Sequence, residues 1–263
     1  MNGTKVIGIV GGMGPRAGIA LYESITNQTP AGTDQEHLSV ILMAFPGNVV
    51  DRTLFLEGKY PVNPGQDIAR IVDKLAVSGA EVIGIACNTS HSPEIFEVID
   101  AEIDRSTHKP KLLHMPMEVC RHLNGIRPAL SRIGVMGTNG TYKCGLYKNL
   151  LEQHGYTVVE PDPVFQNDFI HRMIYDPRSG IKANSNQITD EARMLFGEAI
   201  SYFSKQDVDA VVLGCTELSL VQGEGMVDDM LIIDSTQCFA RALIREARAS
   251  RDVGVSGVTL SNI

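Results

Sequence analysis

Short runs of consecutive apolar residues alternate along the chain with longer segments in which apolar residues recur at helical spacing. The runs expected to be strands are Lys5–Val10, Leu38–Phe45, Val82–Ala86, Leu112–His114, Arg132–Met136, Thr157–Val159, Ala210–Leu213 and Leu231–Ile233. The segments expected to be helices are Pro15–Gln28, Gly65–Ser78, Ser92–Ser106, Thr141–His154, Thr189–Lys205 and Thr236–Ala249. Most of the strand runs do not alternate with polar residues, which is typical of parallel strands covered by helices on both faces. The pattern therefore predicts a doubly wound α/β architecture.

The two halves of the chain resemble each other in the same order. The stretch KVIGIVGGMGP matches SRIGVMGTNGT, and AEVIGIACNT matches VDAVVLGCTE, at offsets of 126 and 128 residues. The second match aligns Cys87 with Cys215. Two matches in register indicate an internal duplication. We therefore predict two pseudo-symmetric, flavodoxin-like domains with the active site in the cleft between them.

The expected domain boundaries follow from this repeat. Residues 1–125 are assigned to the first domain and residues 126–230 to the second. Residues 231–263 are expected to return to the first domain, because the last helix would pack back on it.

Cys87 and Cys215 each follow an apolar run directly, so each is expected at the carboxyl end of a strand, where open α/β sheets bind ligands. A lone cysteine in an apolar run is usually a core residue. Here the repeated position and the polar neighbours Asn88, Thr89 and Thr216 favour a functional pair, because these side chains can donate hydrogen bonds to sulfur or to a carboxylate. Two facing thiols suit inversion at a carbon: one removes a proton and the other delivers one to the opposite face.

Composition narrows the functional classes. The 263 residues carry a net charge of −8 and no concentrated basic cluster, which disfavours a nucleic-acid partner. No apolar run approaches the roughly 18 residues of a membrane span, so no membrane partner is expected. The five cysteines are widely spaced without a C-x-x-C motif, and the histidines show no ligand spacing. We expect free thiols in a cytoplasmic protein, and no metal.

The segment GGMGPRA also fits a loose dinucleotide-binding fingerprint at Gly12, Gly14 and Ala17. The strand that follows ends without the acidic residue that would bind a ribose. Pro15 serves equally well as the first residue of a helix. Nucleotide binding is therefore not favoured.

The stretches GIVGGMGP, DRT, ACNTSH, GTNGTYKCGLY and LGCTELSL, which span most of the chain in order, resemble the aspartate/glutamate racemase family. The opening GGMGP is more similar to the aspartate racemase branch. The resemblance implies a racemase that needs no cofactor, with Cys87 and Cys215 as its two acid–base residues and a small acidic amino acid, aspartate above others, as its substrate. It also implies a homodimer.

The same resemblance implies a set of substrate-binding residues. Arg52 would hold the side-chain carboxylate of an acidic substrate, since a guanidinium binds a carboxylate in bidentate fashion. A second cation is expected from YDPRSGIKANS, with Lys182 favoured over Arg178. The remaining expected substrate-binding residues are Met13, Gly14, Pro15, Asn88, Thr89, Thr138, Thr216 and Glu217.

Two alternatives to aspartate racemisation stay open. A relative of the same superfamily would act on glutamate, a hydantoin or maleate; decarboxylase members keep a single cysteine, so the pair disfavours that branch. A binding protein would hold a carboxylate in the cleft and catalyse nothing. In that case two reactive thiols would be unnecessary.

Overall fold

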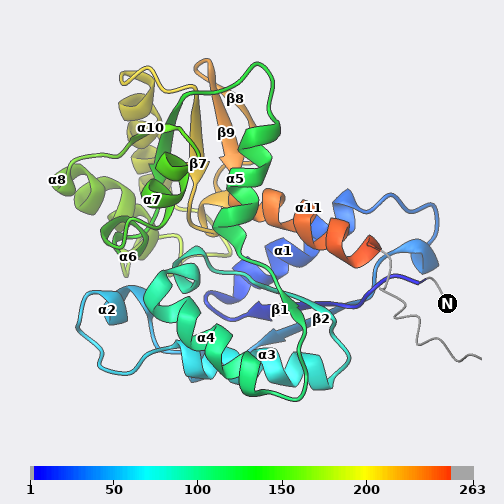
Figure 1. Ribbon diagram of the computed structural model, residues 1–263. Helices are drawn as coiled ribbons and strands as arrows, with labels where there is room; N and C mark the ends of the chain where they lie inside the picture. The colour runs from blue at the N-terminus through cyan, green and yellow to red at the C-terminus, as the bar shows by residue number, and fades with distance from the viewer. Residues whose placement is uncertain (1–2, 250–263) are drawn as a thin grey trace, which may run out of the picture.

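The computed structural model describes residues 3–249, which form two α/β domains, each built around its own sheet (Figure 1). The first sheet has four parallel strands in the order β2 (Val40–Ala44), β1 (Ile7–Gly11), β3 (Val82–Ile85) and β4 (Lys111–Leu112). The second has the order β6 (Thr157–Val159), β5 (Arg132–Met136), β7 (Ala210–Leu213), β9 (Met230–Asp234) and β8 (Gly225–Val227). Only the edge strand β8 of this second sheet is antiparallel to its neighbour. The predicted pair of α/β domains is confirmed.

Helices cover both faces of each sheet. The helices of the first half are α1 (Pro15–Gln28), α2 (Arg52–Leu56), α3 (Gly65–Val77), α4 (Pro93–Arg105) and α5 (Met115–Gly125). Those of the second half are α6 (Asn139–Lys143), α7 (Leu146–Gln153), α8 (Pro163–Phe165), α9 (Arg172–Tyr175), α10 (Asp190–Ser204) and α11 (Ser235–Arg248), with a π-helical segment at Gln166–His171. Apolar side chains of α1 and α11 pack on one face of the first sheet, and those of α3 and α4 pack on the other. In the second domain α5 and α7 face α10 across the sheet.

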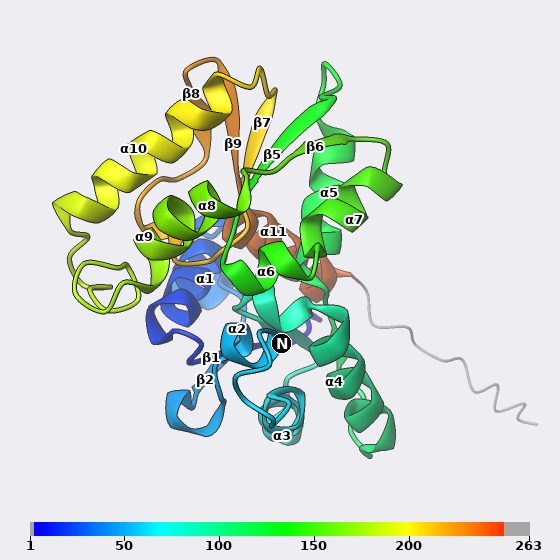
Figure 2. The same ribbon diagram turned by 90° about the vertical axis from the view of Figure 1, so that its left-hand side faces the viewer.

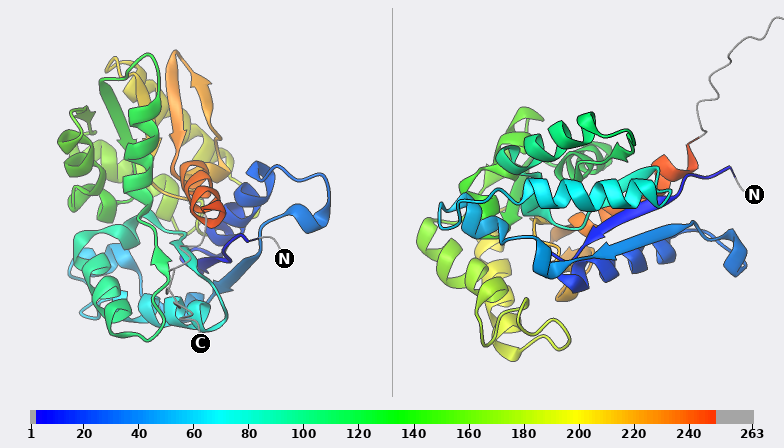
Figure 3. Two further views of the ribbon diagram at one scale, coloured as in Figure 1. Left: turned by 45° about the vertical axis from the view of Figure 1, so that its right-hand side comes forward. Right: turned by 90° about the horizontal axis from the view of Figure 1, so that it is seen from below.

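Two elements cross between the domains, and the expected boundaries differ from the packing at both. Strand β9 pairs in parallel with β7, so residues 231–234 belong to the second sheet and not to the first domain. Helix α5 precedes residue 126, yet its Val119 and Leu123 pack against Ile133 of the second sheet. The C-terminal helix α11 does return to the first sheet, beside α1 (Figure 3). Residues 250–263 of the expected first domain lie outside the described residues.

Several elements were not expected from the sequence. Strand β8, the helices α2, α5, α8 and α9 and the π-helical segment were missed, and the single helix expected over Thr141–His154 is divided into α6 and α7. The division falls at Gly145, whose φ of +63° places it in the left-handed region that ends a helix. In α5, Pro116 occupies the second helical position, where a missing N–H is tolerated.

The carboxyl ends of the central strands lead into the contact region between the domains. In the first domain these are the turns after β1 and β3; in the second they are the turns after β5 and β7. The short helices α2 and α6 face each other across this junction (Figure 2). The Thr53 hydroxyl of α2 donates to the Thr138 hydroxyl at the start of α6, at 3.2 Å. Loops from both domains therefore meet at one place.

Candidate active site

Cys87 lies at the carboxyl end of β3, where the chain leaves the sheet and begins a turn of 3-10 helix over Asn88–His91. The residue is only 6% exposed. Its immediate charged neighbour is the guanidinium of Arg52, which reaches it from α2. Cys87 therefore lies beside a positive charge at the end of its strand.

Arg52 is held in place by main-chain oxygens and by the cap of its helix. Asp51 caps α2 by accepting the amide N–H of Leu54 at 2.9 Å, which puts Arg52 at the first helical position. Nη2 of Arg52 donates to the Met13 carbonyl at 2.8 Å and Nη1 to the Val50 carbonyl at 3.2 Å. Burial alone would lower the pKa of Arg52, but Cys87, Tyr175 and Asp51 outweigh burial and raise it. The guanidinium is therefore a fixed, buried positive charge.

Cys215 lies at the carboxyl end of β7 and has a carboxylate where Cys87 has a cation. Its Sγ–H donates to Oε2 of Glu217 at 3.1 Å, and the residue is 5% exposed. Burial, and then the negative charge of Glu217, raise the pKa of the Cys215 thiol well above its ordinary value. The resting state of Cys215 is the protonated thiol, which suits an acid.

Glu217 is buried and accepts hydrogen bonds from both domains. Its Oε1 accepts hydrogen bonds from Nζ of Lys182 at 2.5 Å and from the amide N–H of Gly14 at 3.1 Å. Its Oε2 accepts hydrogen bonds from the Thr216 hydroxyl at 3.3 Å and from the Cys215 thiol. Burial alone would raise the pKa of Glu217, but the ammonium group of Lys182 outweighs it and the pKa lies below its usual value. Glu217 is therefore an anion that joins Cys215 to the turn after β1.

The Met13 carbonyl oxygen accepts hydrogen bonds from two cations, one near each cysteine-bearing turn. It accepts Nη2 of Arg52 at 2.8 Å and Nζ of Lys182 at 3.4 Å. Gly12, just before it, has φ +97°, and a Cβ there would come within 2.9 Å of the Phe45 nitrogen. Glycine is needed for this turn to pass so close to the neighbouring strand end. The turn thus brings the cation beside Cys87 and the cation beside the Glu217–Cys215 pair to one acceptor.

Threonine hydroxyls seal the junction next to these groups. Oγ1 of Thr89 lies 3.1 Å from that of Thr138 and 3.0 Å from that of Thr141, and Thr53 also donates to Thr138. All four side chains are buried. They come from both domains, so their hydrogen bonds form only when the domains are together.

The Asn88 side chain, expected to bind substrate, bonds two residues of the second half of the chain. Its Nδ2 donates to the Ser235 hydroxyl at 3.0 Å, and its Oδ1 accepts the Tyr147 hydroxyl at 2.5 Å. Ser235 in turn donates to the Leu213 carbonyl at 2.7 Å. The amide of Asn88 thus ties the Cys87 turn to the second domain.

Most of the other expected residues lie at the site. Met13, Thr89, Thr138, Thr216 and Glu217 are buried there and Lys182 is partly buried, whereas Pro15 begins α1 and is exposed. Of the two candidate cations, Lys182 contacts Met13 and Glu217, whereas Arg178 is exposed.

Sequence reasoning missed Tyr175 and the capping role of Asp51. The Tyr175 hydroxyl donates to Oδ2 of Asp51 at 2.9 Å, which links α9 of the second domain to α2 of the first. The Tyr175 ring stacks on His171 at 4.6 Å, and Nζ of Lys182 lies 5.4 Å from its centroid. Both residues open stretches quoted above, Tyr175 in YDPRSGIKANS and Asp51 in DRT, but nothing in the local pattern shows that they bond each other.

His91 is a core residue beside the site. Its Nδ1 lies 2.9 Å from the Cys87 carbonyl, and its ring packs against Phe96, His114 and Phe239. Burial, and then His114, lower the pKa of His91 to about 3, so the ring is neutral at neutral pH. It supports the Cys87 turn and does not supply a proton.

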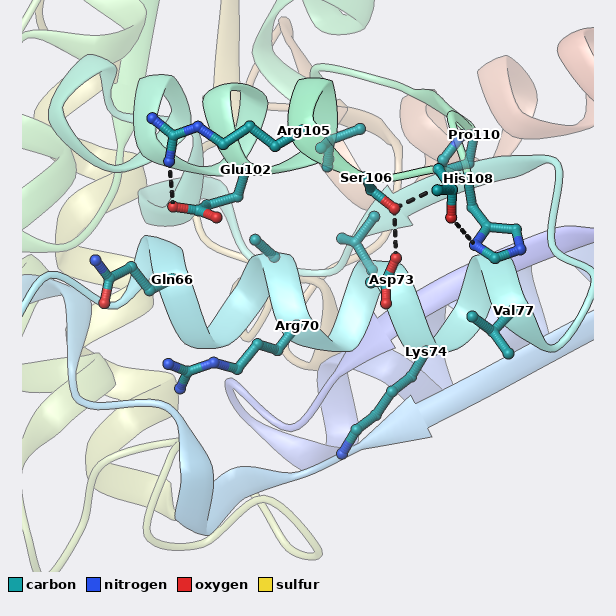
Figure 4. A pocket seen from close by; sticks show the side chains of 14 residues that line it. Gln66, Arg70, Asp73, Lys74, Val77, Glu102, Arg105, Ser106, His108 and Pro110 are labelled. Atoms are coloured by element: carbon teal, nitrogen blue, oxygen red, sulfur yellow. Dashed lines mark hydrogen bonds and ion pairs between the residues drawn. The ribbon is translucent and has the colours of Figure 1, made fainter.

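A separate groove of about 750 Å³ runs between α3 and α4 on the outside of the first domain (Figure 4). Its polar side chains bond one another: Ser106 donates to Asp73 at 2.6 Å, and Arg105 pairs with Glu102 at 3.0 Å. Neither cysteine of the site lines this groove. Within residues 3–249, no helix has the length and apolar character needed to cross a membrane.

The fold and site together define a duplicated two-domain α/β protein in which each half brings one buried cysteine to a shared, cation-lined junction. The chain belongs to the Asp/Glu/hydantoin racemase family, whose model matches residues 10–243. The resemblance inferred from the sequence motifs is confirmed.

The chain is similar along most of its length to several racemases of this family. It is 26% identical over 247 residues to the broad specificity amino-acid racemase RacX of Bacillus subtilis, covering 91% of this chain and 96% of that protein. It is also 26% identical to the glutamate racemase of Corynebacterium glutamicum, over 87% of this chain and 74% of that protein. Among solved structures it is similar to the Picrophilus torridus aspartate racemase, with 28% identity, a TM-score of 0.73 and coverage of 92% and 94% of the two chains.

Proposed function

We propose that this protein racemises an acidic amino acid, aspartate in the first place, by transferring the α-proton between Cys87 and Cys215. The observation that carries the proposal is the convergence of Arg52 and Lys182 on the Met13 carbonyl, with one cation beside each cysteine-bearing turn. Two cations near the two cysteine-bearing turns suit a substrate with two carboxylates, because a guanidinium and an ammonium group can each bind one of them.

The unlike surroundings of the two thiols give them complementary starting roles. Cys87, which lies beside Arg52, removes the α-proton from one face of the substrate. Cys215, which donates to Glu217, starts as the thiol and delivers its proton to the other face. After one turnover Cys87 is protonated and Cys215 is the thiolate, so the opposite enantiomer reacts with the roles exchanged. Fixed cations stabilise the negative charge that develops on the carbon acid.

Closure of the domains supports this chemistry. Both cysteines are almost fully buried, and the Tyr175–Asp51 hydrogen bond and the threonine cluster join the two domains over them. Exclusion of water strengthens the interaction of Arg52 and Lys182 with a bound carboxylate. A substrate must therefore enter while the domains are apart, and the reaction takes place when they close.

The experiment is turnover of L-aspartate and D-aspartate separately in deuterated water. We expect loss of circular dichroism from either enantiomer, together with exchange of the α-proton for deuterium by NMR. Serine at Cys87 or Cys215 should abolish both signals. Full racemisation by each single serine variant would refute the two-thiol mechanism, and binding of aspartate without α-proton exchange would favour a carboxylate-binding protein.

Racemisation of a broader range of amino acids is the second candidate function. The observation that favours it is the similarity to the broad specificity racemase RacX, which extends over nearly the full length of both chains. Racemisation of a panel of amino acids separates the two. Activity confined to aspartate and glutamate supports selection by the two cations. Equal activity on amino acids with neutral side chains supports the broader function.

A further inference from the structure

His122, Glu224 and Cys238 form a cluster of potential metal ligands that includes neither Cys87 nor Cys215. His122 lies in the last turn of α5, Glu224 directly precedes β8, and Cys238 lies in the first turns of α11. One ligand atom from each residue lies within 4.8 Å of the other two. Spacing along the sequence could not reveal this cluster, because its members come from three separate elements.

A positively charged nitrogen already occupies the centre of the cluster. Nη2 of Arg241 lies 2.7 Å from Oε1 of Glu224, 3.2 Å from Sγ of Cys238 and 3.5 Å from Nε2 of His122. Nη1 of Arg241 donates to the second carboxylate oxygen of Glu224 at 2.9 Å. The three ligand atoms are thus arranged around a single point that accommodates positive charge.

We propose that His122, Glu224 and Cys238 bind a divalent transition-metal ion, Zn²⁺ above others, which displaces the Arg241 guanidinium from between them. Imidazole nitrogen, thiolate sulfur and carboxylate oxygen are the donor set that zinc prefers, whereas Mg²⁺ and Ca²⁺ take oxygen ligands. Three protein ligands leave the fourth tetrahedral position to water. The site does not depend on the proposed racemase activity.

The cluster can contract to metal-bonding distances from the solvent side. Zinc bonds of about 2.0–2.3 Å require the three ligand atoms to approach each other to roughly 3.5 Å. Cys238 Sγ and Glu224 Oε1 are already 3.9 Å apart. The side chains of Arg241 and Glu224 are 36% and 31% exposed, so the guanidinium can withdraw into water and the metal has an access path.

Binding is expected to release one proton. The metal takes the place of the thiol proton, and its affinity should rise with pH.

A metal in this position would connect α5 to α11 at the place where the chain passes from the second sheet back to the first. Ser235, at the start of α11, holds the Asn88 amide, and Glu224 ends the loop that follows Glu217. The bound ion should therefore raise the thermal unfolding midpoint of the whole chain.

The experiment is titration of the full chain with Co²⁺ and then Zn²⁺ at neutral pH. We expect a near-ultraviolet thiolate-to-cobalt charge-transfer band that Zn²⁺ abolishes, with release of one proton per ion into a weakly buffered solution. The band should persist in the Cys87→Ser/Cys215→Ser double variant, which removes the other two thiols of interest. It should disappear in Cys238→Ser.

Two further variants test the geometry without removing the thiol. His122→Gln should weaken Co²⁺ binding by more than the roughly 10- to 100-fold that loss of an outer hydrogen-bond partner costs. Arg241→Gln should tighten it, because the competing cation is gone, whereas a cluster that merely pairs charges would give no such gain. Absence of the charge-transfer band in the parent chain, or equal binding by the parent and Cys238→Ser, would overturn the proposal.

Discussion

The ammonium nitrogen of Lys182 lies 2.5 Å from Oε1 of Glu217, and this pair joins the loop after α9 to the turn that carries Cys215. The Glu217 side chain is 4% exposed and that of Lys182 is 21% exposed. A buried ion pair is costly to break from one side, because the remaining charge stays buried without compensation. The pair therefore has consequences for stability as well as for substrate binding.

Replacing Lys182 by methionine should lower the free energy of unfolding by about 3 kcal/mol, since an uncompensated buried carboxylate is left behind. The Lys182→Met/Glu217→Gln double variant should recover part of this loss. Urea denaturation of both single variants and the double variant measures the coupling. Strictly additive losses would show that the pair does not interact as the structure describes.

The same pair predicts an acid dependence of stability. The pKa of Glu217 lies below its ordinary value in the folded protein. Its contribution is therefore complete above the ordinary carboxyl pKa of about 4.3 and is lost as pH falls through the folded value. Unfolding free energies measured across this acidic range should fall less steeply for Glu217→Gln than for the parent chain. An unchanged slope would contradict the assignment.

The two cysteines should be individually required for racemisation. Cys87→Ser and Cys215→Ser should each lower kcat by at least about 10²- to 10⁴-fold, the usual contribution of one general acid–base group. Cys144→Ser is the matched control: Cys144 is partly buried and donates to the Thr141 carbonyl, which a serine can also do. Polarimetry should show this control close to the parent rate. A comparable loss in all three variants would point to a general effect on folding.

Glu217 should set the proton affinity of Cys215. Its carboxylate accepts the Cys215 S–H at 3.1 Å, which stabilises the thiol over the thiolate. Glu217→Gln removes that negative charge, so the pKa of Cys215 should fall. The pH dependence of alkylation, measured in a Cys87→Ser background, reports Cys215 with the Cys87 thiol removed. A profile that stays in place, or moves to higher pH, would rule out this role.

Tyr175 should hold the domains closed through its hydroxyl. Tyr175→Phe keeps the ring on His171 but removes the hydrogen bond to Asp51. The loss of a hydrogen bond to a charged group, about 1.5 kcal/mol, should raise KM for aspartate by about tenfold with a smaller change in kcat. Tyr156→Phe is the control, because its hydroxyl bonds Asn124 at the surface. Equal KM values for the two variants would show that the Tyr175 hydroxyl does not hold the domains closed.

Local sequence pattern was sufficient for much of the fold. Strands β5, β6 and β7 and helix α1 have the predicted bounds, because consecutive apolar residues and a 3.6-residue period reflect burial that each segment carries in itself. The same pattern put Cys87 and Cys215 at strand ends. Helix α2 is only five residues long, too short for a period to show, and its capping residue Asp51 was not recognised.

The sequence by itself therefore determined the alternating elements, the duplication and the placement of both cysteines at strand ends. Only the tertiary structure decided that β9 and α5 belong to the second domain, that the Asn88 amide is bonded to Ser235, and that Tyr175 reaches Asp51. The physical reason is that these contacts join residues far apart in the chain. Their formation depends on how the crossover connections place whole elements, which no local period of apolar residues encodes.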